Sequence, residues 1–162
     1  MHSLAIRQGA LCFVALLFFG CAAASPVRHI EGYSTSVADK AAATAITMVG
    51  RPYKYKGDSP SGFDCSGLVR YSYLAAGMDV PHGTSSLRDH TRSVSPREMR
   101  KGDLLFFNER GKKYSHVGIY IGNNLFVHAP STGKTVRKDN LQDPYWKDHF
   151  LGARRFPLGV KE

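Results

Sequence analysis

The sequence lacks a hydrophobic run long enough to cross a membrane. Its main apolar segment, Leu11 to Phe19, has nine residues, whereas a transmembrane helix needs about 20. Acidic residues are also few, because 13 Asp and Glu stand against 22 Lys and Arg, for a net charge of +9. The 162 residues are 43% hydrophobic and 22% charged. This composition argues against a disordered, collagen-like or coiled-coil chain and is typical of one globular domain.

Cysteine is scarce as well, and only Cys12, Cys21 and Cys65 are present. An odd count prevents all three from pairing with one another, so at least one thiol has another role. The short zinc-binding patterns Cys-x-x-Cys and His-Glu-x-x-His do not occur. We therefore expect no metal site and no cofactor.

The N-terminal residues 1–20 have the pattern of a secretory signal peptide. Arg7 and the chain amine are the only positive charges in the first ten residues, and small residues follow the apolar segment. Such a segment directs the chain out of the cytoplasm. We therefore expect an exported protein.

Two cleavage sites fit this signal peptide. Leu17 to Cys21 resembles a bacterial lipobox, which would make Cys21 the lipidated first residue, while Ala22-x-Ala24 fits a cut by ordinary signal peptidase after Ala24. Either route leaves Cys65 as the only free thiol, so no disulfide is available in an oxidising compartment. Residues 21–35, of which 25–35 are polar and short of core residues, are expected to be a tether before a single domain at 36–162.

The excess of positive charge favours acidic partners such as cell-wall polymers or anionic lipids. The basic residues are dispersed and lack the interleaved aromatic residues of a nucleic-acid groove. We therefore predict a solvated basic surface and no nucleic-acid partner.

The first half of the domain has helical patterns. A helix is expected from about Ser36 to Gly50, with Ala38, Ala42, Ile46 and Val49 on its buried face. After a loop at 50–62, Asp64 is placed to cap a helix over 65–76, which Gly77 ends. Its inward residues are expected to be Leu68, Tyr71 or Ser72, and Ala75. A short helix is predicted over 84–91.

The second half has short apolar segments that indicate β-strands. They cover residues 103–107, 116–121, 125–129 and 152–155, and a Gly122-Asn123-Asn124 turn joins the second to the third. Helices followed by strands indicate an α+β fold, with the N-terminal helices packed on one face of an antiparallel sheet.

Cys65 is a candidate nucleophile on physical grounds. It would be the first residue of a helix, where free N–H groups and the positive end of the dipole stabilise a thiolate. A backbone N–H there can also stabilise the oxyanion of a tetrahedral intermediate. Ser66 and Gly67 are small enough to let a substrate approach. The alternative is a buried, inert cysteine.

His116 and His128 are candidate partners of this thiol because they flank one predicted hairpin. If Gly122-Asn123-Asn124 forms a three-residue loop, His128 lies opposite Gly118, and the two imidazoles share one side of the sheet. A two-residue loop would place them on opposite sides. On the first reading His116 takes the proton of Cys65, and His128 orients the His116 ring.

Four ordered motifs resemble the NlpC/P60 cysteine peptidase family across residues 37–156. They are Asp64-Cys65-Ser66-Gly67, the segment from Arg100 to Phe107, the segment from His116 to Gly122, and Phe126-Val127-His128-Ala129. The resemblance implies a papain-like fold and cleavage of peptidoglycan peptides. It also implies that Cys65 is the nucleophile, His116 the base and His128 the third polar residue.

The resemblance also implies further site residues. Gly50-Arg51-Pro52-Tyr53 resembles the family's Gly-x-Pro-Tyr, so Tyr53 is a candidate hydroxyl donor. Asp64 and Ser66 match positions that contact the substrate's amine in some members, although Asp64 is equally suited to be a helix cap. Thr84 matches the Ser/Thr of a Pro-Arg-x-Ser/Thr-x-x-Gln motif, in which His82 and Leu87 here replace the Arg and the Gln.

These observations together predict a monomeric cysteine endopeptidase of peptidoglycan stem peptides or cross-links. The short layout resembles small murein endopeptidases of Gram-negative bacteria, which implies a periplasmic lipoprotein of the outer membrane. A non-catalytic peptidoglycan-binding module, an amidase or an acyltransferase on the same fold remain as alternatives.

Overall fold

The computed structural model describes residues 34–109, 111–131 and 134–157. The predicted signal peptide, Cys21 and nearly all of the predicted tether lie outside these residues. Within the described part of the chain, no helix is both long and apolar enough to span a membrane.

The first helix, α1 (Thr35–Thr47), begins one residue earlier than expected. The hydroxyl of Ser34 accepts a hydrogen bond from the backbone N–H of Val37 and so caps it. Its buried residues are all alanines, at positions 38, 41, 42 and 45. Ile46 and Val49, which were expected to face inward, are 37% and 42% exposed. The helix packs closely through its smallest side chains, so its buried face is rotated from the predicted one.

The second helix, α2 (Cys65–Ala75), begins at the predicted residue. The carboxylate of Asp64 accepts the N–H of Gly67 at 2.7 Å, and Gly77 ends the helix with a φ of +92°. Leu68 and Ser72 are buried as expected. Ala75 is exposed, and Val69 and Tyr73 are buried in its place. The short helix α3 (Thr84–Asp89) confirms the prediction for this segment.

The main sheet has six antiparallel strands in the order β3-β8-β4-β5-β6-β7. Their bounds are β3 (Arg92–Val94), β4 (Leu104–Glu109), β5 (Lys112–Gly122), β6 (Leu125–His128), β7 (Arg137–Asn140) and β8 (Phe150–Arg155). The strands β1 (Asp58–Ser59) and β2 (Gly62–Phe63) form a separate small hairpin, and η1 (Pro96–Glu98) is a single 3₁₀ turn. No sequence pattern predicted β3, β7 or the helix α4 (Pro144–His149).

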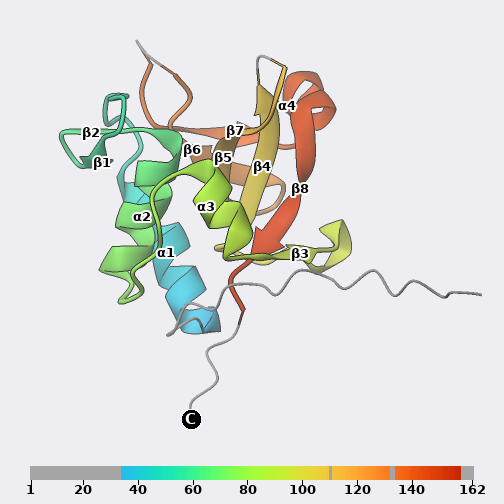
Figure 1. Cartoon of the computed structure of the whole chain (residues 1–162), viewed down its shortest axis with the longest axis horizontal. Coiled ribbons are helices and arrows are strands. Elements are labelled where there is room, and N and C mark those ends of the chain that lie inside the picture. The colour runs from blue at the N-terminus through green and yellow to red at the C-terminus, as the bar shows by residue number, and fades with distance from the viewer. Residues whose placement is uncertain (1–33, 110, 132–133, 158–162) are drawn as a thin grey trace, which may run out of the picture.

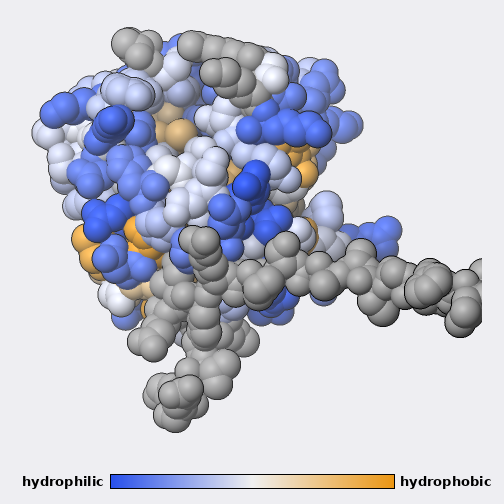
Figure 2. Space-filling model, in the orientation of Figure 1, coloured by the Kyte–Doolittle hydropathy of each residue, from blue (hydrophilic) through white to orange (hydrophobic). Residues whose placement is uncertain are grey.

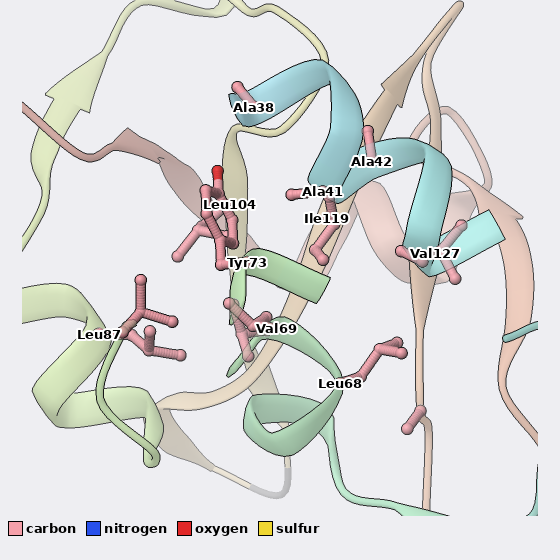
Figure 3. Close-up of a cluster of buried hydrophobic side chains, with 14 of the residues drawn as sticks. Ala38, Ala41, Ala42, Leu68, Val69, Tyr73, Leu87, Leu104, Ile119 and Val127 are labelled. Atoms are coloured by element: carbon pink, nitrogen blue, oxygen red, sulfur yellow. The ribbon is translucent and has the colours of Figure 1, made fainter. Parts of the chain in front are cut away.

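Both faces of this sheet are covered (Figure 1). Leu104 and Phe106 of β4 belong to the cluster under α1, α2 and α3, part of which Figure 3 shows. Leu105 and Phe107 point the opposite way and pack with Trp146 of α4. The continuous apolar run in β4 is therefore explained by burial on both faces. The predicted placement of the N-terminal helices on one face is confirmed, and α4 is an addition on the other.

The β5–β6 hairpin has the register that was predicted from a three-residue loop, although its turn is different. Ile119 pairs with Val127 and Tyr120 with Phe126. The turn consists of Asn123 and Asn124, both with positive φ, and a register shift between Tyr120 and Gly122 adds one residue to β5. A two-residue turn and a bulge therefore have the same effect on side-chain direction as the predicted three-residue loop.

The face of the molecule in Figure 2 carries mainly hydrophilic side chains, and its apolar residues form small separate groups. This agrees with the 22 basic and 13 acidic residues of the sequence.

Candidate active site

A cleft of about 600 Å³ brings together side chains from distant parts of the sequence. It lies between the start of α2, the β4–β5 hairpin, the segment after β6 and α4. The lining residues are Tyr53, Tyr55, Cys65, Glu109, Ser115, His116, Pro130, Ser131, Lys134 and Tyr145. Three residues that were predicted to be catalytic, Tyr53, Cys65 and His116, therefore share one cavity.

Cys65 occupies the first position of α2, at the wall of this cleft. Its sulfur is hydrogen-bonded by the backbone of Val117 and of Ser66. Val117 directly follows His116 in β5, so the contact holds the sulfur next to the strand that carries the candidate base. The helix start and the strand thus position the thiol together.

The Cys65 thiol is neutral in the free protein. Burial raises its pKa to about 12, and the negative charge of Asp64 acts in the same direction, against the opposing effect of the two backbone hydrogen bonds. The expectation of a resting thiolate at the helix N-terminus is therefore not met. Burial and a neighbouring carboxylate outweigh the favourable helix end, so the sulfur must lose its proton during the reaction.

The two predicted histidines are in direct contact. Nε2 of His116 lies 2.8 Å from Nδ1 of His128, and the side chains are 2% and 0% exposed. Gly118, between them in the register, makes this possible, because a Cβ there would lie 2.6 Å from the Phe126 ring and 3.3 Å from Cβ of His128. Burial lowers the pKa of both imidazoles, so both rings are neutral at pH 7.

Behind the histidines lies Asp139, which the sequence analysis missed. Its Oδ2 atom is 3.0 Å from Nε2 of His128 and accepts hydrogen bonds from Nε1 of Trp146 at 2.8 Å and from Arg137. Burial acts to raise the pKa of Asp139, but the hydrogen bonds from His128, Arg137 and Trp146 lower it to about 2. The result is a carboxylate at the end of a chain that runs from His116 through His128.

Trp146 also shields the two histidines. Its ring stacks on His116 at a centroid distance of 5.8 Å and meets the edge of His128 at 4.8 Å. Because Asp139 lies in β7 and Trp146 in α4, two elements without a clear sequence pattern, no local signal pointed to either residue.

A second carboxylate faces the other side of His116. Oε2 of Glu109 lies 3.6 Å from Nδ1 of His116, and the Tyr145 hydroxyl donates a hydrogen bond to Oε1 of Glu109 at 3.3 Å. These contacts show that Nδ1 of His116 is the nitrogen on the cleft side. Glu109 and Tyr145 were not predicted to be part of the site.

The three predicted substrate contacts, Asp64, Ser66 and Thr84, are not among the residues that line the cleft. Asp64 caps α2, accepts a hydrogen bond from the hydroxyl of Ser66 and lies 3.0 Å from Nε2 of His82. His82, which departs from the motif of the resembling family, therefore has a definite partner. Thr84 is the first residue of α3.

Gly67 has a different role from the one expected for it. A Cβ at this position would lie 1.9 Å from the backbone oxygen of Gly57. The absence of a side chain lets α2 pack against the loop before β1, whereas the sequence analysis had assigned the space to substrate. Among the described residues, no group of three or more His, Cys, Asp or Glu side chains is arranged to hold a metal ion.

Comparison with known proteins gives a consistent set of similarities. The model of the NlpC/P60 family matches residues 50–155. The chain is 41% identical over 113 residues to "Probable endopeptidase YafL" and 41% identical over 116 residues to "Murein DD-endopeptidase MepH", both of Escherichia coli K12. These matches cover 67% and 68% of this chain but 45% and 42% of the relatives. The chain thus spans less than half the length of either relative.

Solved structures show the same similarity. A lipoprotein-like NLP/P60 family protein of Staphylococcus aureus Mu50 superposes with a TM-score of 0.67 at 32% identity, over 82% of this chain and 44% of that one. An NlpC/P60 family protein of Bacillus cereus ATCC 10987 superposes with a TM-score of 0.68 at 31% identity, over 74% and 40% of the two chains.

Proposed function

Because this chain belongs to the NlpC/P60 family, we propose that it is a cysteine endopeptidase that hydrolyses amide bonds in peptidoglycan peptides. The observation that carries the proposal is that Cys65 and His116 line one cleft and that His116 is hydrogen-bonded to His128 behind it. The names of the two bacterial relatives, an endopeptidase and a murein endopeptidase, support the same substrate class.

The protonation states favour attack with general base catalysis. Nδ1 of His116 takes the proton of the Cys65 thiol while the sulfur attacks the carbonyl carbon of the amide. The carbon–sulfur bond forms as the carbonyl π electrons move to oxygen. When the tetrahedral intermediate collapses, the carbon–nitrogen bond breaks and His116 returns the proton to the leaving amine. Water then hydrolyses the thioester by the same route.

We assign the start of α2 and Tyr53 to stabilisation of the oxyanion. The first N–H groups of a helix lack partners within the helix and point out of its end. The N–H of Gly67 donates to Asp64 and the backbone of Ser66 bonds the Cys65 sulfur, so we assign the N–H of Cys65, the first residue of α2, to the oxyanion. Tyr53 lines the same cleft, and we assign its hydroxyl to the substrate or to the oxyanion.

Charge supports the substrate class as well. Peptidoglycan stem peptides carry free carboxylates, and the net charge of +9 attracts them. Lys134, which is exposed, is the one Lys or Arg side chain among the residues that line the cleft. Asp64, Ser66 and Thr84 do not line the cleft, and their proposed role at the amine side of the substrate rests on the resemblance of their motifs to those of the family.

We also propose that the protein is exported to the periplasm and anchored in the outer membrane by a lipid on Cys21. The support is the lipobox-like segment from Leu17 to Cys21 and a substrate that lies outside the cytoplasm. The test is metabolic labelling with palmitate followed by membrane fractionation. Label that persists in Cys21→Ala, or wild-type protein without label, contradicts the lipid anchor.

Digestion of purified muropeptides followed by mass spectrometry tests the activity. We expect fragments from cleavage between amino acids, and we expect Cys65→Ala to abolish them. His116→Ala should lose nearly all activity, and His128→Ala somewhat less. Release of intact stem peptides from the sugar would indicate an amidase, transfer products an acyltransferase, and binding without products a non-catalytic module. Each of these results contradicts the proposal.

A further inference from the structure

The proposed reaction requires a lone pair on Nδ1 of His116, the nitrogen at the cleft. A neutral imidazole carries one proton, and that proton can sit on either nitrogen. If it sits on Nδ1, His116 cannot accept the proton of Cys65. The proposed function therefore requires the proton of His116 to sit on Nε2. The inference about what holds it there rests on that proposed function.

Two carboxylates compete at the two ends of the histidine pair. Glu109 lies 3.6 Å from Nδ1 of His116, beyond hydrogen-bond distance, whereas Asp139 lies 3.0 Å from Nε2 of His128, within it. A carboxylate only accepts hydrogen bonds, so each one attracts an N–H toward its own end. The closer contact belongs to Asp139.

Counting protons along the chain gives one consistent order. Asp139 is ionised, so Nε2 of His128 must carry the proton and donate it to Oδ2. Nδ1 of a neutral His128 then has a lone pair, and it accepts a hydrogen bond from Nε2–H of His116 across 2.8 Å. Nδ1 of His116 is left with a lone pair that faces the cleft. The reverse order would place a lone pair of His128 against the carboxylate.

We propose that Asp139 is a positioning residue that sets the tautomers of His128 and, through it, of His116. It touches neither Cys65 nor the cleft, so it acts only through the two rings. When His116 takes the proton of the thiol, the same chain of hydrogen bonds connects the new positive charge to the Asp139 carboxylate.

The strand register and two further hydrogen bonds position Asp139 beside His128. In the β6–β7 register, His128 pairs with Arg137 and Phe126 pairs with Asp139, so Asp139 lies one diagonal step from His128 on the same face. Trp146 and Arg137 fix its Oδ2 atom from two other directions. The facing charged groups are thus Arg137 at Asp139 and Glu109 at the opposite end of the pair.

Two substitutions separate the parts of this role. Asp139→Asn removes the charge but keeps an oxygen that accepts a hydrogen bond, and Asp139→Leu removes the acceptor at similar size. We expect kcat for muropeptide cleavage to fall about 10-fold in the first and about 100-fold in the second, with KM within twofold of wild type. Asp143→Asn and Asp143→Leu are the matched controls, because Asp143 is exposed and makes no side-chain cap bond.

The decisive readout is the tautomer itself, measured from the imidazole ¹⁵N shifts of His116 and His128 in the purified protein at pH 7. We expect Nε2–H on both rings in wild type and a population of Nδ1–H in Asp139→Leu. Three results would overturn the inference. They are Nδ1–H on His116 in the wild type, unchanged tautomers in Asp139→Leu, and a kcat of Asp139→Leu within threefold of wild type. If Asp139→Leu does not fold, the wild-type spectrum and Asp139→Asn decide.

This measurement does not depend on turnover. A wild-type protein that cleaves no muropeptide contradicts the proposed function but leaves the tautomers to be read from the same spectra. Conversely, an active enzyme with the reverse proton order contradicts only the role of Asp139.

Discussion

Gly67→Ala is the substitution whose effect can be worked out most directly from the structure. The new Cβ would lie 1.9 Å from the backbone oxygen of Gly57, 2.9 Å from its carbon and 3.1 Å from Cα of Asp58. Ordinary contacts of a Cβ begin near 3.4 Å, so α2 and the loop must separate by more than 1 Å. The same Gly57 oxygen accepts the N–H of Asp64 at 2.9 Å, so the cap of α2 moves as well.

Two measurements check this reasoning. Overpacking of this kind costs about 1–3 kcal/mol of unfolding free energy, which urea denaturation measures. Because Cys65 is two residues before Gly67, the thiol shifts by about 1 Å, and a shift of that size lowers kcat about 100-fold. Gly77→Ala is the control at the other end of α2: it has open space but a φ of +92°, so it loses stability without loss of kcat. Wild-type kcat in Gly67→Ala would refute the argument.

Three further predictions concern buried ionisable groups. Because burial raises the pKa of Cys65 to about 12, its alkylation by iodoacetamide should accelerate about tenfold per pH unit from pH 7 to 10; a plateau below pH 9 contradicts this. Arg155→Met leaves the buried Asp103 carboxylate without its partner at 2.6 Å, so urea denaturation should show a loss of about 3–5 kcal/mol. Arg70→Met, which breaks two exposed pairs, with Asp58 and Asp79, should cost under about 1 kcal/mol, and equal losses in the two variants would disprove the assignment. Burial lowers the pKa of His116 and of His128, and their unfolded forms bind protons near pH 6.5, so the free energy of unfolding should fall as the pH drops below 6.5; a constant value from pH 7 to 5 contradicts this.

The helix that carries the nucleophile could be predicted from local signals. Asp64 caps it, Cys65 begins it and Gly77 ends it, as the residue types indicated. The buried face of α1 could not be predicted in the same way. Of the predicted residues, Ala38 and Ala42 are buried but Ile46 and Val49 are exposed, and close packing buries Ala41 and Ala45 in their place.

The hairpin shows how a correct prediction can have a different structural cause. Whether His128 shares one side of the sheet with His116 depends on the register of β5 and β6. A three-residue loop and a two-residue turn with a bulge produce the same register. Whether the residues between the strands form a three-residue loop or a turn with a bulge is decided by backbone conformation, here by positive φ at Asn123 and Asn124.

The sequence by itself determined the start of the α2 helix and the family, because each depends on residue types at short spacing, but it left the pairing of the two histidines open between two loop lengths. Only the tertiary structure decided the protonation of Cys65 and the place of Asp139 behind His128. Both depend on burial and on contacts between distant or unpatterned segments, and local propensity carries no information about either.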